Sequence, residues 1–318
     1  MTEPPFSLWS LRSVVEEALF QSIFSGAFHT LAPMKILSDL PDLREAVARL
    51  PRPLALVPTM GALHSGHCAL IKEARRLAGP EGSVAVSIFV NPIQFDDAAD
   101  LGSYPCPLED DLAQCSQEGV DLVFTPEKGS LYAPNHSTLV TESQLTRHLC
   151  GATRPGHFEG VLTIVLKLFN LFQPDQAVFG DKDFQQLALI RRMVRDLNHP
   201  VQITGHPTVR EPDGLALSSR NVRLSAAQRA DASRIPRSLR AARDLAVTGE
   251  QNPSVYLDSA RTRLLDAAPD GFAIDYLELV DPETVQPVSK VTDSAVLATA
   301  CFYDEIRLID HLTIRLKG

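Results

Sequence analysis

The sequence predicts an α/β fold in which a Rossmann-like parallel sheet is followed by a smaller α+β domain. Up to about residue 206, short apolar runs alternate with segments of helical periodicity, an order typical of a parallel sheet covered by helices on both faces. After about Pro207, two helical segments come first and three strand-like segments follow, which indicates an α+β arrangement. Ligands of parallel sheets bind beyond the carboxyl ends of the strands, so polar loops at those ends are the first candidates for a site.

Each predicted strand is a short run rich in Val, Ile, Leu or Phe, and each predicted helix carries its apolar residues on one face. In the first part we expect strands at 54–57, 84–90, 121–124, 177–179 and 201–204, and helices at 66–77, 108–118, 158–172 and 183–197. In the second part we expect helices at 226–247 and 254–267, then strands at 272–280, 295–301 and 306–309.

These patterns divide the chain into an extension over residues 1–33, a Rossmann-like domain over 34–206 and a smaller, lid-like domain over 207–318. The apolar run at 19–24 is too short for a secretory signal, and no basic segment precedes it. Met34 resembles a second, more natural beginning. We therefore interpret residues 1–33 as a misplaced start, a loosely ordered extension, or an added helix that packs on the surface or on a partner.

The amino-acid composition argues against some classes of function. The 318 residues carry a net charge of −9, and 44% of them are apolar, which allows a sizeable core and argues against a general nucleic-acid binder with a basic stripe. No run is long and apolar enough to make a membrane partner or a membrane span. Five scattered cysteines without a CxxC pair indicate reduced thiols and a cytoplasmic location.

The string PTMGALHSGH, residues 58–67, follows the first predicted strand and opens the next helix. Free backbone N–H groups and the positive end of the helix dipole gather at such a turn and favour a phosphate. Gly61 and Gly66 allow the backbone to approach a ligand, and His64 and His67 can both donate to phosphate oxygens. A plain strand–helix turn with two surface histidines is the alternative. Neither the Walker lysine motif nor a GxGxxG run is present.

Two further strings suit a nucleotide. LSSRN, residues 217–221, offers hydroxyls and the guanidinium of Arg220 for clamping phosphates, although SSR alone is common surface chemistry. GDKD, residues 180–183, stands at a predicted strand end. There Lys182 can neutralise phosphate charge, and Gln186 just beyond can donate to and accept from a hydroxy acid. A helix start capped by Asp183 explains the same residues, and both interpretations can hold.

Two more polar groups complete the candidates. In NPIQF, residues 91–95, Asn91 begins a turn at a strand end, and Gln94 is a candidate substrate contact. Asp110, Asp111 and Gln114 fall within little more than one helical turn and are oxygen donors of the kind that suits Mg²⁺. Such an acidic helix face is, by itself, more often simply solvated.

The strings PTMGALHSGH, SIFVNPIQF, RPGHFEGV, VFGDKDFQQL and LALSSRN occur in this order, and with them the chain strongly resembles the pantothenate synthetases (pantoate–β-alanine ligases) of the nucleotidyltransferase superfamily. The resemblance begins at about Met34 and reaches nearly to the C-terminus. It implies an enzyme that condenses (R)-pantoate with β-alanine to pantothenate through pantoyl adenylate, with ATP as substrate and AMP and pyrophosphate as products. It also implies Mg²⁺ and a homodimer.

The resemblance assigns roles by motif position. The implied catalytic residues are His67 as proton donor, His64, Lys182 and Arg220. The implied ATP-binding residues are Met60, Gly61, Ala62, Leu63, His64, Ser65, Gly66, His67, Gly180, Asp181, Lys182, Asp183, Val209, Leu217, Ser218, Ser219 and Arg220. The implied substrate-binding residues are Gln94, Gln186, Asn91 and Arg154, with His157 near the acyl site. The implied magnesium residues are Asp110, Asp111 and Gln114.

The chain departs from the family pattern at three positions. Cys106 stands where members usually carry an arginine, and we expect the loss of that arginine to weaken a local ion pair or the order of a loop. Asp181 replaces a usual glutamate, and Leu217 replaces a frequent methionine. Two alternatives stay open: another nucleotidylyltransferase with the same HxxH turn, and a binding paralogue that has lost catalysis. The first would not need the two glutamines, and the intact histidines, lysine and arginine argue against the second.

Overall fold

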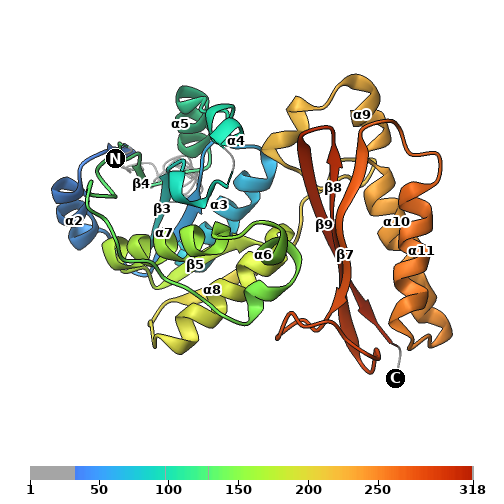
Figure 1. Ribbon diagram of the computed structural model, residues 1–318. Helices are drawn as coiled ribbons and strands as arrows, with labels where there is room; N and C mark the ends of the chain where they lie inside the picture. The colour runs from blue at the N-terminus through green and yellow to red at the C-terminus, as the bar shows by residue number, and fades with distance from the viewer. Residues whose placement is uncertain (1–32, 97, 128, 317–318) are drawn as a thin grey trace, which may run out of the picture. The chain divides into compact units, whose positions relative to one another are not determined.

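The computed structural model describes residues 33–96, 98–127 and 129–316, and Met34–Gly318 forms one compact unit (Figure 1). The extension predicted over residues 1–33 lies, apart from Pro33, outside the described residues. Within the described part of the chain, no helix has the length and apolar character that crossing a bilayer requires.

A six-stranded sheet with the order β1-β4-β3-β2-β5-β6 organises the first part, and all of its strand pairs are parallel. Its strands are β1 (Lys35–Leu37), β2 (Leu54–Thr59), β3 (Ser83–Ile88), β4 (Leu122–Phe124), β5 (Gln176–Gly180) and β6 (Gln202–His206). The order changes direction at β2, because β3 and β4 lie on one side of it and β5 and β6 on the other. The carboxyl ends of β2 and β5 therefore flank the switch point at which such sheets bind ligands. The predicted parallel α/β sheet is confirmed, and β1 is an additional strand.

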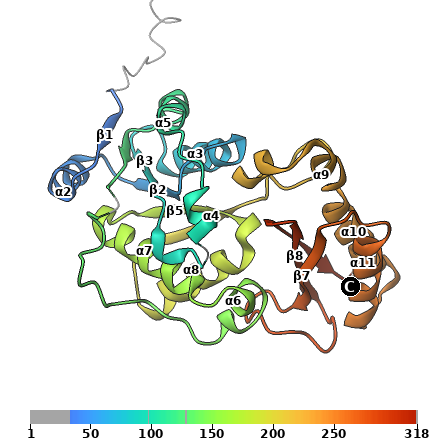
Figure 2. The same cartoon turned by 45° about the horizontal axis from the view of Figure 1, so that its top comes forward.

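Alternating side chains of the strands divide between two cores, as the pleat requires. Leu54 and Leu56 join the core under α2 (Leu40–Arg49), α7 (His157–Phe172) and α8 (Phe184–Asp196). Ala55 and Val57 join the core under α3 (Ser65–Ala78) and α5 (Leu108–Gln117). The two groups of helices cover opposite faces of the sheet (Figure 2).

Several short helices lie in the connections of this part. They are η1 (Pro92–Gln94), α4 (Ala98–Gly102), η2 (Leu145–Arg147), α6 (Leu149–Thr153) and η3 (Asp181–Asp183). All of them except η2 supply residues to the cavity described below.

The second part is an antiparallel sheet of β7 (Phe272–Val280), β8 (Ser294–Tyr303) and β9 (Ile306–Arg315), preceded by η4 (Ser219–Arg223) and helices. α10 (Arg234–Arg243) and α11 (Pro253–Leu265) cover one face (Figure 1). On β8, Leu297 packs toward these helices, whereas Val296 and Ala298 join the core of the first part. The boundary predicted between 206 and 207 stays a prediction, since the two parts share a core.

The single helix expected over 226–247 is wrong. The segment forms α9 (Ala226–Asp231), α10 and η5 (Asp244–Thr248). The break before α10 precedes Pro236, whose ring clashes with the carbonyl four residues earlier and which has no N–H to bond it. The residues of the segment remain helical on each side of that break.

Candidate active site

A cavity of about 460 Å³ lies beyond the carboxyl ends of β2, β3 and β5 and extends to β7 and β9. This volume is typical of small-molecule sites. The predicted residues that line it are Met60, His64, Gly66, His67, Asn91, Gln94, Arg154, His157, Gly180, Lys182, Asp183, Gln186, Val209, Leu217, Ser218, Ser219 and Arg220. The predicted residues that do not line it are Gly61, Ala62, Leu63, Ser65, Asp181, Asp110, Asp111 and Gln114. Segments predicted separately from five strings therefore meet in one place.

Two histidines cap the start of α3. His64 Nδ1 accepts a hydrogen bond from the Gly66 N–H at 3.1 Å, and His67 Nδ1 accepts one from the His64 N–H at 3.3 Å. Because both Nδ1 atoms are acceptors, the neutral rings carry their hydrogens on Nε2. A Cβ atom at residue 66 would lie 2.8 Å from His64 Cε1, so glycine is needed for the ring to reach the backbone.

Both rings are neutral at pH 7. Burial, followed by the charge of Lys182, lowers the pKa of His64 to about 4. Burial, followed by His64 and Lys182, lowers the pKa of His67 to about 3. The pair thus presents neutral Nε2–H donors, which suit phosphate oxygens. Proton donation by His67 stays a prediction.

Two of the three residues expected to bind magnesium, Asp111 and Gln114, hydrogen-bond to the loop between β2 and α3. Asp111, 1% exposed, accepts hydrogen bonds from the backbone N–H groups of Ala62 at 2.9 Å and Leu63 at 2.7 Å. Gln114 donates to the Leu63 carbonyl at 3.2 Å, and Asp110 is exposed. None of the three lines the cavity, and the described residues contain no cluster of His, Cys, Asp or Glu side chains suited to a metal. The predicted set does not fit a metal site directed at the cavity.

Gln94 is held from several sides at the cavity wall. Asn91, 1% exposed, donates to Gln94 Oε1 at 3.0 Å and to the Gly160 carbonyl at 3.1 Å, and it accepts from the Tyr132 hydroxyl at 2.9 Å. The polar atoms of Asn91 are thus already bonded within the protein. Its geometry fits the orientation of Gln94 better than direct substrate contact.

The backbone around Gln94 is fixed as well. His157 Nδ1 donates to the Gln94 carbonyl at 2.7 Å, and burial, followed by the charge of Arg154, lowers the pKa of His157 to about 4. A Cβ at Gly160 would lie 2.6 Å from Gln94 Cα, so α7 approaches η1 closely only with glycine there. Gln186 also lines the cavity, and its side chain has no hydrogen-bond partner among the described residues.

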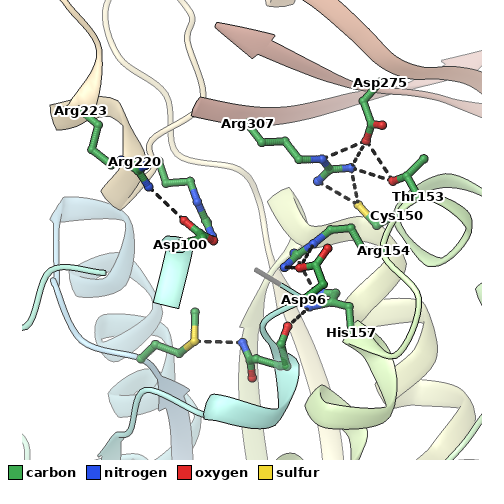
Figure 3. Close-up of polar contacts among 12 residues, drawn as sticks. Asp96, Asp100, Cys150, Thr153, Arg154, His157, Arg220, Arg223, Asp275 and Arg307 are labelled. Atoms are coloured by element: carbon green, nitrogen blue, oxygen red, sulfur yellow. Dashed lines mark hydrogen bonds and ion pairs between the residues drawn. The ribbon is translucent and has the colours of Figure 1, made fainter. Parts of the chain in front are cut away.

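The cationic side chains of the cavity differ in how firmly they are paired. Lys182 has one ion-pair partner among the described residues, Asp183, at 3.9 Å. Arg154 is paired with Asp96 at 2.5 Å, and Arg220 with Asp100 at 2.7 Å (Figure 3). Lys182 is therefore the cation whose charge is least compensated by a direct contact.

The backbone folds back on itself after β6 and brings Val209 close to Leu217, two residues implied in ATP binding. The Leu217 N–H donates to the Val209 carbonyl at 3.0 Å, so the segment that ends in LSSR folds back beside the end of β6. Arg210 secures this return with bonds of 2.7 and 2.8 Å to the buried carboxylate of Asp310 on β9. Asp310 raises the pKa of Arg210, mainly through these hydrogen bonds.

Some cavity residues were not expected from the sequence. Arg307 of β9 bonds to Asp275 of β7 at 2.6 Å and contacts Cys150 Sγ at 3.5 Å (Figure 3). Arg307 and Asp275 stand in segments expected only to build the second sheet, and Cys150 lies in α6, where no helix was expected. The substituted position Cys106 is exposed, and its thiol donates to the Tyr104 carbonyl at 3.5 Å.

Comparison with known proteins agrees with this geometry. The family model described as pantoate-beta-alanine ligase matches residues 35–313. A pantothenate synthetase of Akkermansia muciniphila is 48% identical over 284 residues, covering 88% of this chain and 100% of that relative. A crystal structure of pantothenate synthetase from Thermus thermophilus is 46% identical, with a TM-score of 0.82 and coverage of 88% of this chain and 99% of that one. The pantoate-beta-alanine ligase of Francisella tularensis, in complex with Beta-gamma ATP and Beta-alanine, is 31% identical, with a TM-score of 0.71 and coverage of 88% and 97%. The chain therefore belongs to the pantoate–β-alanine ligase family of enzymes.

Proposed function

We propose that this enzyme condenses (R)-pantoate with β-alanine at the cavity, in an ATP-dependent reaction that passes through pantoyl adenylate. The observation that carries the proposal is the meeting of the histidine-capped start of α3 with Lys182 at the switch point between β2 and β5. Such a place offers N–H donors and a cation to a polyphosphate. The Francisella tularensis relative, bound to an ATP compound and β-alanine, supports ATP and β-alanine as ligands.

In the first step, the pantoate carboxylate attacks the α-phosphate of ATP, and the bond to pyrophosphate breaks with its electron pair leaving on pyrophosphate. A carboxylate is already ionised at neutral pH, so this step needs charge neutralisation and alignment more than a base. Lys182, Arg220 and the two Nε2–H donors are suited to that task, and Gln94 and Gln186 are suited to hold the hydroxy acid.

In the second step, the uncharged amine of β-alanine attacks the acyl carbon, AMP leaves, and the amine loses a proton. The adenylate is sensitive to water, so the reacting centre must be covered. β7 and β9 contribute a wall of the cavity, which shields part of the reacting centre from water.

The decisive assay follows AMP release from ATP and Mg²⁺ with both acids, and then with each acid omitted in turn. AMP that appears only with both acids is the expected result. Pyrophosphate exchange that depends on pantoate, without AMP, would place the defect in the amine step. Silence in both assays would favour one of the alternatives, another nucleotidylyltransferase or a binding paralogue.

Lys182→Gln tests the role of the least compensated cation. We expect pantoate-dependent pyrophosphate exchange to fall by about 100-fold or more, as when a transition-state donor is removed. Lys72→Gln is the matched control, because Lys72 lies on α3 with its side chain 68% exposed. Equal rates for the two variants would remove Lys182 from the mechanism.

We also infer, from the family resemblance, that the enzyme uses Mg²⁺ with its ATP and acts as a cytoplasmic homodimer. No step above is assigned to a metal on Asp110, Asp111 and Gln114, because these side chains do not line the cavity. Light scattering is expected to give twice the chain mass of 34.8 kDa, and a monomer mass at micromolar concentration would contradict the dimer.

A further inference from the structure

Two arginines of η4 share one carboxylate on α4. Arg220 Nη2 lies 2.7 Å from Asp100 Oδ2, and Arg223 Nη1 lies 3.0 Å from Asp100 Oδ1 (Figure 3). The three side chains are between 22% and 24% exposed, so the group is only partly screened by water. The contact joins a loop near the end of β3 to the loop that follows β6.

The arrangement controls the position of Arg220. Two guanidinium groups this close repel each other unless an anion lies between them, and Asp100 supplies that anion. Asp100 accepts a hydrogen bond from one nitrogen of Arg220, whereas a guanidinium has five N–H donors. The other donors have no side-chain partner among the described residues, and Arg220 and Asp100 both line the cavity.

A second contact supports the same orientation. The Arg220 guanidinium carbon lies 6.0 Å from the centre of the Tyr104 ring, within reach of a cation–π interaction. The Tyr104 hydroxyl is in turn 3.4 Å from Ser219 Oγ. Burial acts to raise the pKa of Asp100, but the hydrogen bonds and charges of Arg220 and Arg223 outweigh it and hold that pKa below its usual value. The carboxylate is therefore ionised at neutral pH.

We propose that Asp100 is a positioning residue for the nucleotide, which acts through Arg220 and does not itself touch the substrate. It separates the two arginines and turns the free donors of Arg220 toward the phosphates. The inference rests on the proposed function, because it takes the phosphates of ATP as the ligand of Arg220.

Asp100→Asn tests this role by removing the charge while keeping the shape. We expect KM for ATP to rise by about 10-fold or more, the effect of losing one charge-assisted hydrogen bond, while KM for pantoate changes less than twofold. Asp100→Glu should recover part of the loss. Glu73→Gln, which breaks an ion pair with Arg76 on α3 outside the cavity, is expected to behave like the parent enzyme.

A double-variant cycle separates positioning from general stability. In an Arg220→Gln background, Asp100→Asn should have no further effect on KM for ATP, because the two residues act as a unit. Three outcomes would overturn the proposal. The two substitutions could have independent effects, or Asp100→Asn could leave KM for ATP unchanged. Asp100→Asn could also lower KM for ATP, which would mark Asp100 as a competitor of the phosphates. Failure of the parent enzyme to show pantoate-dependent exchange would instead refute the proposed function, so the two failures are distinguishable.

Discussion

Asp111→Asn separates loop support from metal binding, the role that the family resemblance implies. The carboxylate bonds two backbone N–H groups, one through each oxygen, at 2.9 and 2.7 Å. An asparagine keeps one oxygen and turns an NH₂ group toward the other N–H, donor against donor. A hydrogen bond to a charged group contributes about 1.5–3 kcal/mol, and losing one lowers the Tm of a domain of this size by about 3–10 °C.

The assay is thermal unfolding without ATP and without divalent metal, followed by the dependence of the rate on Mg²⁺ concentration. Asp110→Asn is the matched control, since Asp110 is the exposed neighbour on the same helix. We expect only Asp111→Asn to lose stability, and its activity to fall because the loop that carries His64 shifts. A normal Tm together with a raised Mg²⁺ requirement in both variants would refute the reasoning and restore the metal site.

Three further predictions concern stability and substrate binding. The folded-state pKa values of about 4 for His64 and about 3 for His67 lie below the unfolded value of 6.5, so the unfolded chain binds more protons below pH 6.5. The free energy of unfolding should therefore be highest above pH 6.5 and decline as pH falls toward 4. Denaturant unfolding of a His64→Gln, His67→Gln double variant should show a weaker decline. Gly160→Ala places a Cβ 2.6 Å from the backbone of Gln94, so we expect a loss of about 1–3 kcal/mol and a raised KM for pantoate; an unchanged KM would show that η1 can yield. Asp310→Asn removes the buried negative charge that pairs with Arg210 and leaves one acceptor oxygen, so we expect a loss of about 3–5 kcal/mol in urea unfolding. A change below about 1 kcal/mol would mean that water compensates for the lost charge.

Much of the parallel-sheet half was predictable because its four central strands, β4, β3, β2 and β5, are mostly buried. Such strands appear as apolar runs, and the helices between them have one apolar face each. β1 was missed because its three residues are exposed or half-buried, which leaves no apolar run. The break in the 226–247 segment carried a local signal, Pro236, which the helical periodicity on both sides concealed.

The site was predicted at the level of segments more than of individual contacts. The carboxyl ends of parallel strands lie along one edge of the sheet, so the polar segments that follow these strands meet there. What a polar side chain bonds to within the protein is not local information: Asp111 bonds backbone groups 48 and 49 residues away, and Asp100 bonds a guanidinium 120 residues away. A carboxylate that supports a loop and one that binds a metal have the same sequence signature, and only the fold distinguishes them.

β8 has a consequence for how molecules enter and leave the cavity. Residues 295–301 of this strand are all buried, so no face of the central strand is wetted. Swinging the antiparallel sheet away from the first half would bring Val296 and Ala298 into water, at about 25 cal/mol for each Å² of apolar surface exposed. η4, at the end of the segment that follows β6, has no buried residues, so moving it would expose little apolar surface. We therefore expect ligands to enter and leave the cavity beside η4, while the antiparallel sheet stays in place.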